Sequence, residues 1–148
     1  MPRSGGELIR PAQVGDAAAI APLLGELGYP TDPAAVPTRL QRLLEGPDTG
    51  VLVAERSGRV IGLAAYQLTT LLYSSQPSCR LTALVVDGTH RGRGAAKALV
   101  SEVEAIARQH GCFRIEVTTR PSRSEALLAY GALGFQRRPH RLVKTLGP

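Results

Sequence analysis

VVDGTHRGRGAAKALVSEVEAIARQHG, residues Val85 to Gly111, is the stretch of sequence that decides the fold. It begins as an apolar strand and ends as an amphipathic helix, in which Leu99 and Val103 recur at helical spacing. Between the two lies an abrupt turn, GTHRGRGAA, with three glycines and two arginines. Either this turn only needs glycine for positive φ and its arginines are solvated, or it is a cradle for phosphate.

The phosphate interpretation follows from the position of the turn at the start of a helix. A helix N-terminus leaves unpaired N–H groups pointing outward and carries a partial positive charge. Residues Arg91 to Lys97 would supply successive amides there, and Arg91 and Arg93 would add charge-assisted bonds. The Walker pattern is absent, and the dinucleotide fingerprint fails because Lys97 stands where its third glycine should be. Glu116 follows at about the distance of a ribose-binding acid, so a dinucleotide site remains a less favoured alternative.

Hydrophobic periodicity around this stretch predicts an ordered series of strands and helices. Strands are expected at residues 7–10, 50–55, 60–73, 78–87, 112–119, 135–138 and 140–146. Besides the helix after the turn, helices are expected to follow caps at Asp16, Asp32 and Ser122. Pro22 should kink or shorten the first helix.

The order of these elements predicts the topology. The strands between residues 50 and 87 follow one another without helices, so they should be antiparallel. The strands on either side of the long helix should be parallel. The predicted fold class is therefore α/β (α+β), a single domain over residues 1–148 with a mixed central sheet of about seven strands and helices on both faces.

Composition limits the partners. The net charge is +6 and the pI is near 10, which suits an anionic ligand. With four Tyr and two Phe and no long basic run, a nucleic-acid groove is disfavoured. Cys79 and Cys112 fit neither a CxxC nor a metal-binding spacing. The amino-terminal residues lack the apolar run of a signal peptide, and no segment reaches membrane-spanning length. We expect a cytoplasmic protein that contacts no membrane and holds no metal.

Two motifs carry a resemblance to a known family. The run Arg91-Gly92-Arg93-Gly94-Ala95-Ala96 resembles the Arg/Gln-x-x-Gly-x-Gly/Ala motif of the GNAT superfamily of acetyl-CoA-dependent N-acetyltransferases. A strand ending in Leu84-Val85-Val86 precedes it, as in the family. Downstream, ALLAYGALGFQ at residues 126–136 resembles the second family signature, with Ala126, Tyr130, Gly134 and Phe135 at its spacing. The element order also agrees along nearly the whole chain.

The resemblance implies a site. Backbone groups of Leu84 and Val86 would pair with the pantetheine arm as an added strand does. Amides of the turn would hold the pyrophosphate, and the N–H of Val86 would polarise the acetyl carbonyl. Tyr130 would protonate the departing thiolate as the catalytic residue, although packing against Phe135 would also explain it. The implied cofactor-binding set is Leu84, Val85, Val86, Arg91, Gly92, Arg93, Gly94, Ala95, Ala96, Lys97 and Ser122. Ser122 lies where many members carry an asparagine.

The implied function is transfer of the acetyl group of acetyl-CoA to a primary amine of a small molecule or protein, by direct attack in a ternary complex. No base is assigned, because the strand at 78–86 contains no glutamate and Glu55, Asp87, Glu116 and a water relay remain open. The acceptor is expected between the first helices and the end of the third strand, where Tyr29, Asp32, Tyr66 and Tyr73 would line a cleft. A homodimer remains open. The alternatives are a non-catalytic CoA-binding sensor and a nucleic-acid-binding protein.

Overall fold

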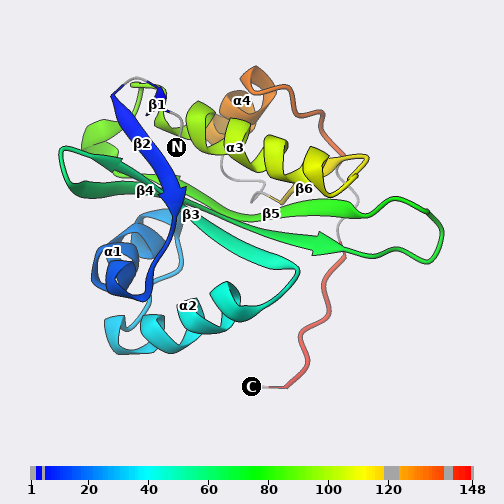
Figure 1. Ribbon diagram of the computed structural model, residues 1–148, viewed down its shortest axis with the longest axis horizontal. Coiled ribbons are helices and arrows are strands. Elements are labelled where there is room, and N and C mark those ends of the chain that lie inside the picture. Colours follow the sequence, from blue (N-terminus) through cyan, green and yellow to red (C-terminus); the bar gives the residue numbers. More distant parts are fainter. Residues whose placement is uncertain (1–2, 5, 119–123, 139–141, 148) are drawn as a thin grey trace. The chain divides into compact units, whose positions relative to one another are not determined.

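A computed structural model of the chain describes residues 3–4, 6–118, 124–138 and 142–147. The described residues fall into two compact units, one within residues 1–118 and one within residues 119–148. The first unit holds the sheet and the helices that cover it (Figure 1). The expectation of one domain over residues 1–148 stays a prediction.

The described residues form one sheet of six strands in the order β1-β2-β3-β4-β5-β6 (Figure 1). The strands are β1 Arg3–Ser4, β2 Glu7–Pro11, β3 Thr49–Arg56, β4 Arg59–Thr69, β5 Ser78–Val86 and β6 Ile115–Val117. Strands β1 to β5 pair antiparallel, whereas β5 and β6 pair parallel. The mixed sheet predicted from the order of elements is confirmed, with six strands instead of about seven.

The strands expected at residues 135–138 and 140–146 were the wrong part of that prediction. Residues 135–138 and 142–147 contain no strand, and residues 139–141 lie outside the described residues. A strand needs a neighbouring edge to satisfy its backbone. The described part of the second unit offers one helix, α4 Ser124–Ala132, and no strand edge.

The helices begin and end largely where the local signals indicated. Helix α1 Ala17–Leu27 follows the short 3-10 turn η1 Val14–Asp16 and continues through Pro22 until Gly28, whose φ of 106° ends it. Helix α2 Val36–Glu45 follows η2 Pro33–Ala35, which Asp32 caps through the Ala34 N–H. Helix α3 is Ala95–Gln109. None of the helices in the described ranges is long and apolar enough to cross a membrane.

The sheet buries apolar side chains on both faces. Val53, Leu63 and Val85 point to one face and pack with the apolar stripes of α1 and α2. Helix α3 covers the opposite face, where a Cβ at Gly62 would lie 3.4 Å from Leu99. Figure 1 shows α1 and α2 on one side of the sheet and α3 on the other. Helices on both faces are thus confirmed.

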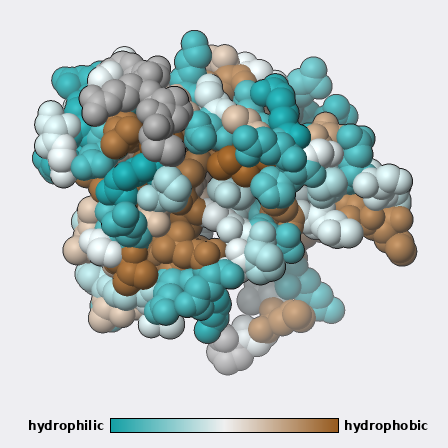
Figure 2. Space-filling model, viewed as in Figure 1, coloured by the Kyte–Doolittle hydropathy of each residue, from teal (hydrophilic) through white to brown (hydrophobic). Residues whose placement is uncertain are grey.

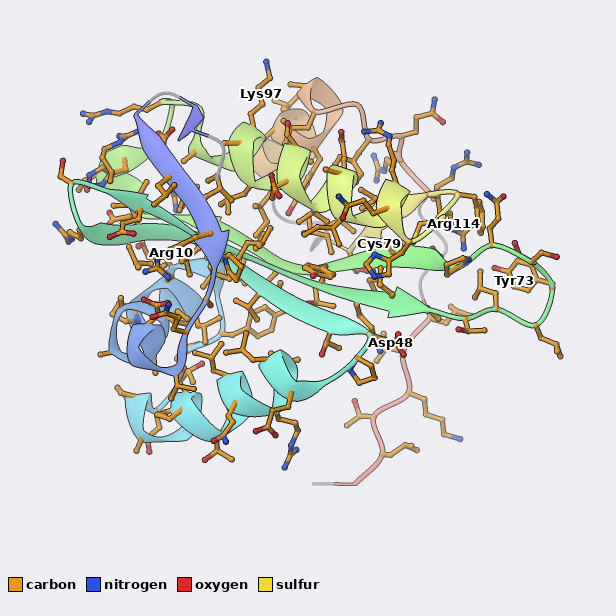
Figure 3. All side chains as sticks on the ribbon, in the orientation of Figure 1. Arg10, Asp48, Tyr73, Cys79, Lys97 and Arg114 are labelled. Atoms are coloured by element: carbon orange, nitrogen blue, oxygen red, sulfur yellow. The ribbon has the colours of Figure 1, made fainter. Side chains whose placement is uncertain are left out.

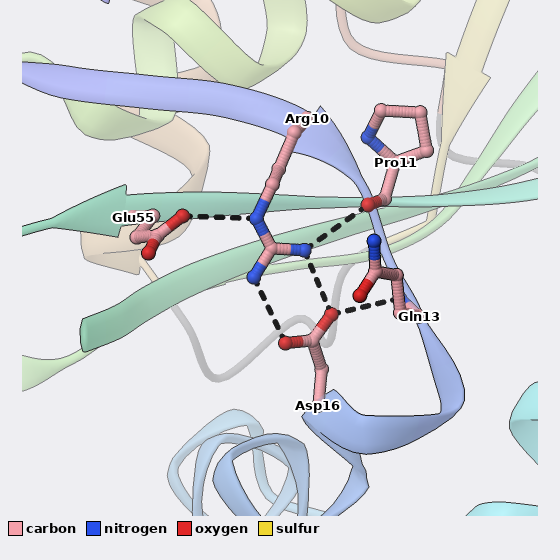
Figure 4. A network of polar contacts seen from close by, with 5 residues as sticks. All are labelled: Arg10, Pro11, Gln13, Asp16 and Glu55. Carbon is pink, nitrogen blue, oxygen red and sulfur yellow. Dashed lines mark hydrogen bonds and ion pairs between the residues drawn. The ribbon is translucent and has the colours of Figure 1, made fainter. Parts of the chain in front are cut away.

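One polar network fastens β2 to β3 and to the start of α1 (Figure 4). The Arg10 guanidinium donates two 2.9 Å bonds to the Asp16 carboxylate and one 2.9 Å bond to Glu55 on β3. The Gln13 N–H donates a 2.7 Å bond to Asp16 as well. The bonds from Arg10 and Gln13 hold the pKa of Asp16 below its usual value. Glu55, one of the residues left open as a base, thus belongs to this network.

Replacing Asp16 by Asn should lower the free energy of unfolding by about 1–3 kcal/mol at pH 7, because a bidentate charged hydrogen bond is lost. The folded-state pKa is the lower one, so this stabilisation is complete above the unfolded pKa of about 3.9. It should disappear as the pH falls from about 5 through the folded pKa. Urea unfolding of both proteins across this pH range measures the difference.

The control is Glu104→Gln, which removes a half-buried carboxylate 3.7 Å from the exposed Arg108. It should change the free energy of unfolding by less than about 0.5 kcal/mol. An Asp16→Asn protein as stable as wild type at pH 7 would contradict the structural role of the network.

Candidate functional site

Strand β5 contains a bulge at Thr82. Ala83 pairs with Ala65 of β4, but Leu81 already pairs with Tyr66, so Thr82 has no register partner on β4. On the other side of β5, pairing with β6 ends at Leu81 opposite Val117, one residue before the bulge. Within residues 6–118, the last part of β5 therefore has one neighbouring strand instead of two.

The backbone direction of this last part can be followed from its hydrogen bonds. The Asp87 N–H donates to the Ile61 carbonyl of β4 at 2.7 Å. Because successive residues of a strand point their backbone groups to opposite sides, Val85 also faces β4, and Leu84 and Val86 face away from it. The Val86 carbonyl accepts a 3.2 Å bond from Arg91 Nε on that side. We call this side of Leu84 and Val86 the free edge of β5.

Val85, which was predicted to bind the cofactor together with Leu84 and Val86, points its backbone groups to the other side of the strand. Its side chain is only 6% exposed and lies in the core under α1 and α2. Its backbone pairs with Leu63 of β4. Val85 therefore supports the strand, whereas the backbone groups of Leu84 and Val86 line the free edge.

The glycine turn follows the free edge directly. Asp87 caps its first part, η3 Gly88–His90, by accepting 2.9 Å bonds from the Thr89 N–H and hydroxyl. Gly92 and Gly94 have φ of 80° and 89°, a left-handed conformation that favours glycine. The helical bonds of α3 begin with the Ala98 N–H on the Gly94 carbonyl. The N–H groups between Gly94 and Ala98 thus precede the helical ladder, at the positive end of the helix dipole.

The cationic side chains of the turn take different positions. The guanidinium of Arg91 is held by two elements of the fold. Its Nε donates to the Val86 carbonyl at the end of β5, and its Nη2 is 3.7 Å from the Glu26 carboxylate of α1. Arg93 and Lys97 are exposed, and Figure 3 shows Lys97 pointing away from the sheet. The two alanines that begin the helix differ: Ala95 is buried and Ala96 is half-buried.

Glu26 is a residue of this site that the sequence did not reveal. Its carboxylate accepts a 2.9 Å bond from the Gly88 N–H, so the end of α1 holds the start of the turn. The contact joins residues 62 positions apart. One signal was available: Glu26 stands in the last turn of α1, where the helix dipole disfavours a negative charge.

Helix α4 carries the second signature in the other unit. Gly134 has a φ of 94°, and the Phe135 N–H returns to the Tyr130 carbonyl at 3.0 Å. The rings of Tyr130 and Phe135 meet edge to face, 5.5 Å apart. The spacing Tyr-x-x-x-Gly-Phe is therefore a helix-ending motif with its own contacts. Ser122 lies outside the described residues.

These features are shared with a family of known proteins. A model of the acetyltransferase (GNAT) family matches residues 18–135. The chain belongs to this family. Rat N-acetyltransferase family 8 member 2 is 35% identical over 91 residues, 62% of this chain and 40% of that protein. Mouse N-acetyltransferase 8 is 32% identical over 98 residues, 66% of this chain and 43% of that protein. The matched region thus spans about two fifths of these relatives.

Solved structures show the same fold at low sequence identity. An aminoglycoside N-acetyltransferase in complex with CoA superposes with a TM-score of 0.85 at 21% identity, covering 99% of this chain and 98% of that one. A transcriptional regulator from Bacillus halodurans gives a TM-score of 0.83 at 24% identity, covering 95% and 99%. The GNAT fold thus accounts for nearly the whole chain.

The acidic residues considered as a base in this GNAT protein are engaged elsewhere or exposed. The bonds from Thr89 lower the pKa of Asp87, which acts as a cap. Glu55 is bonded to Arg10, and Glu116 is exposed, 3.8 Å from Arg114. Among the described residues, no three His, Cys, Asp or Glu side chains gather as a metal site would require. The base remains unassigned.

The aromatic residues expected near the acceptor are spread over the first unit. A Cβ at Gly50 would lie 2.3 Å from the Tyr66 ring, so that ring lies across β3. Asp32 caps η2. Tyr73 is exposed in the β4–β5 connection, whose tip carries hydrophobic side chains in Figure 2. These residues lie on different elements, and the acceptor site stays a prediction.

Removing the Glu26 carboxylate should loosen the glycine turn. In Glu26→Ala the Gly88 N–H loses its acceptor, and its hydrogen exchange should accelerate by roughly tenfold, the equivalent of about 1.4 kcal/mol. Glu26→Gln keeps an acceptor oxygen and should retain the protection of Gly88. Amide exchange measured by NMR reports both. Unchanged exchange of Gly88 in Glu26→Ala would show that α1 does not hold the turn.

Proposed function

We propose that this protein transfers the acetyl group of acetyl-CoA to a primary amine by direct attack within a ternary complex. The observation that carries the proposal is the continuity of two features: the free edge of β5 leads directly into the glycine turn at the start of α3. An extended arm ending in a pyrophosphate has the matching shape and charge. A family neighbour solved with CoA supports the choice of cofactor.

The residues present fit such a cofactor. Leu84 offers its N–H and C=O groups, and Val86 its N–H group, to the amides of the pantetheine arm, as an added strand would. The Val86 carbonyl already accepts a bond from Arg91. The amides from Arg91 to Lys97 would hold the pyrophosphate at the positive end of α3. A Cβ built at Gly92 or Gly94 meets no atom within 4 Å, so both glycines border open space. Ser122 is the further contact proposed for the arm.

The direction of the arm decides which amide polarises the acetyl carbonyl. The pyrophosphate is held by the turn, which follows Val86 in the chain. The arm then runs back along β5, so the thioester lies toward Leu84 and the bulge. We therefore assign the polarising N–H to Leu84 and leave Val86 to bind the arm, in place of the assignment that the resemblance suggested.

The chemistry transfers one acyl group and one proton. The lone pair of a neutral amine attacks the acetyl carbonyl, and the negative charge on oxygen is stabilised by the Leu84 N–H. The carbon–sulfur bond then breaks, and the thiolate receives a proton from the Tyr130 hydroxyl, which we propose as the general acid. The positively charged nitrogen of the tetrahedral intermediate loses its proton to solvent or to an unassigned base, and Tyr130 regains a proton from solvent.

The direct test is the release of free thiol from acetyl-CoA across a panel of primary amines. Amine-dependent thiol release with formation of the N-acetyl product supports the enzyme. Binding of CoA without thiol release for any amine would favour the alternative, a non-catalytic CoA-binding module.

Two glycines with the same conformation allow a matched test of the phosphate site. Gly94 and Gly111 lie at opposite ends of α3, have φ of 89° and 74°, and border open space. Alanine at either position should cost about 1–2 kcal/mol of stability through left-handed strain. Only Gly94→Ala places a methyl group against the pyrophosphate, so it alone should weaken CoA binding, by about 10- to 100-fold. Calorimetry with CoA that gives equal affinity for both variants would exclude the turn as the phosphate site.

The general-acid role of Tyr130 predicts a specific kinetic change. Tyr130→Phe keeps the ring beside Phe135 and removes the proton donor, so kcat should fall by about 10²- to 10⁴-fold. Because the loss belongs to the transition state, kcat/KM should fall equally and CoA affinity should stay the same. Steady-state kinetics and calorimetry measure these values. Unchanged turnover in a folded Tyr130→Phe protein would leave Tyr130 with its packing role alone.

A further inference from the structure

The face of the sheet opposite α3 carries exposed polar side chains beside the bulge. On β5, Cys79 and Leu81 are buried, and Arg80 between them is exposed. Since Leu81 pairs with Tyr66 and lies on the α3 side, alternation points Arg80 to the opposite face. The exposed residues that share this face are Gln67, Arg80, Glu116 and Thr118.

Arg80 lies one residue before the last described pair of β5 and β6. The last residues that pair between these strands are Leu81 and Val117. The guanidinium of Arg80 reaches across to β6 and donates a 3.0 Å bond to the Thr118 hydroxyl, one residue beyond the last pair. The charged group of Arg80 is therefore placed beside the last described pair of β5 and β6, on the face away from α3.

The bonding of Arg80 leaves most of its donors unused within the first unit. A guanidinium has five N–H groups, and the bond to Thr118 uses one of them. Within residues 6–118, none of the ion pairs includes Arg80. The neighbouring Arg114 differs, because it bonds Ser78 and Tyr73 and lies 3.8 Å from Glu116. Figure 3 shows Arg114 and Tyr73 together at this end of the sheet.

This position matches the place where an acceptor must arrive. In the proposed reaction, on which this inference rests, the acetyl group lies on the free edge between Leu84 and the bulge. Arg80 is two residues before Thr82, on the order of 7 Å along the strand. Helix α3 covers one face of the sheet, and on the opposite face Gln67, Arg80 and Glu116 are exposed. An amine that approaches over these exposed residues passes the Arg80 guanidinium.

We propose that Arg80 binds a carboxylate on the acceptor, so that the preferred substrate is an amine that carries a carboxylate a few bonds from its nitrogen. The planar guanidinium matches a carboxylate with two parallel hydrogen bonds. The bond to Thr118 holds the guanidinium in place before the substrate binds. Arg80 thereby positions the amine toward the acetyl carbon and selects against amines without an anionic group.

The test compares amino acids with their carboxamides, which have nearly the same shape and a neutral group in place of the carboxylate. Wild-type protein should acetylate the acid with a kcat/KM about 10- to 100-fold higher than its amide, the range of a charged hydrogen-bonded pair. Arg80→Gln should remove this preference by slowing the acid and not the amide. CoA affinity, measured by calorimetry, should not change.

Two further variants separate a specific contact from charge and from folding. Arg80→Lys keeps the positive charge but lacks the two parallel donors of the guanidinium, and it should retain only part of the preference for the acid over the amide. Arg42→Gln removes the same charge from the exposed surface of α2 and should retain all of it. Equal turnover of acid and amide by wild-type protein, or a preference that persists in Arg80→Gln, overturns the role of Arg80. Absence of thiol release with every amine overturns the proposed function itself, and this inference with it.

Discussion

Between Leu81 and Ala83, β5 carries one more residue than the part of β4 beside it. A bulge of this kind increases the local twist and bends the strand. Within residues 6–118, pairing with β6 ends at Leu81, so the outer side of β5 from Thr82 to Val86 has no strand partner among these residues. The free edge, the turn after it and the position of Arg80 all depend on this point. With regular pairing throughout, the backbone groups of Leu84 and Val86 would bond β6 and none would remain for a ligand.

The glycine turn depends on support from outside its own sequence. Glycine permits the left-handed residues Gly92 and Gly94, but it does not fix where the turn lies. That is determined by Asp87, which caps the first part, and by Glu26, which holds the Gly88 N–H from α1. A negative side chain close to an anion site weakens its positive potential, and the Arg91 guanidinium, 3.7 Å from Glu26, offsets that charge. The amides of the turn and the exposed side chains of Arg93 and Lys97 are thus left as the sources of positive potential.

Local patterns in the sequence predicted the elements that are determined by nearby residues. The strands from residue 50 to 87, the helix after the turn and the parallel pair follow from periodicity and connection length, and the structure confirms them. The bulge could not be predicted, because Thr82 is an ordinary strand residue and the extra position exists only relative to β4. Glu26 and Gly88 are 62 residues apart, beyond any local pattern. The expected strands after residue 134 had suitable residues, but a strand also requires an edge, which a single sequence does not show.

The distribution of arginines explains how a basic protein can be selective. Arg10 is bound by Asp16 and Glu55, Arg56 by the buried Glu7, and Arg114 by Ser78, Tyr73 and Glu116. These side chains contribute to the net charge of +6, yet they are engaged within the protein. Near the free edge of β5, exposed cations are Arg91, Arg93 and Lys97 after it and Arg80 before it. Positive charge at both ends of the free edge suits two different anions. One is a phosphate at the glycine turn, and the other is a smaller anionic group at the bulge. The reacting atoms then lie between them.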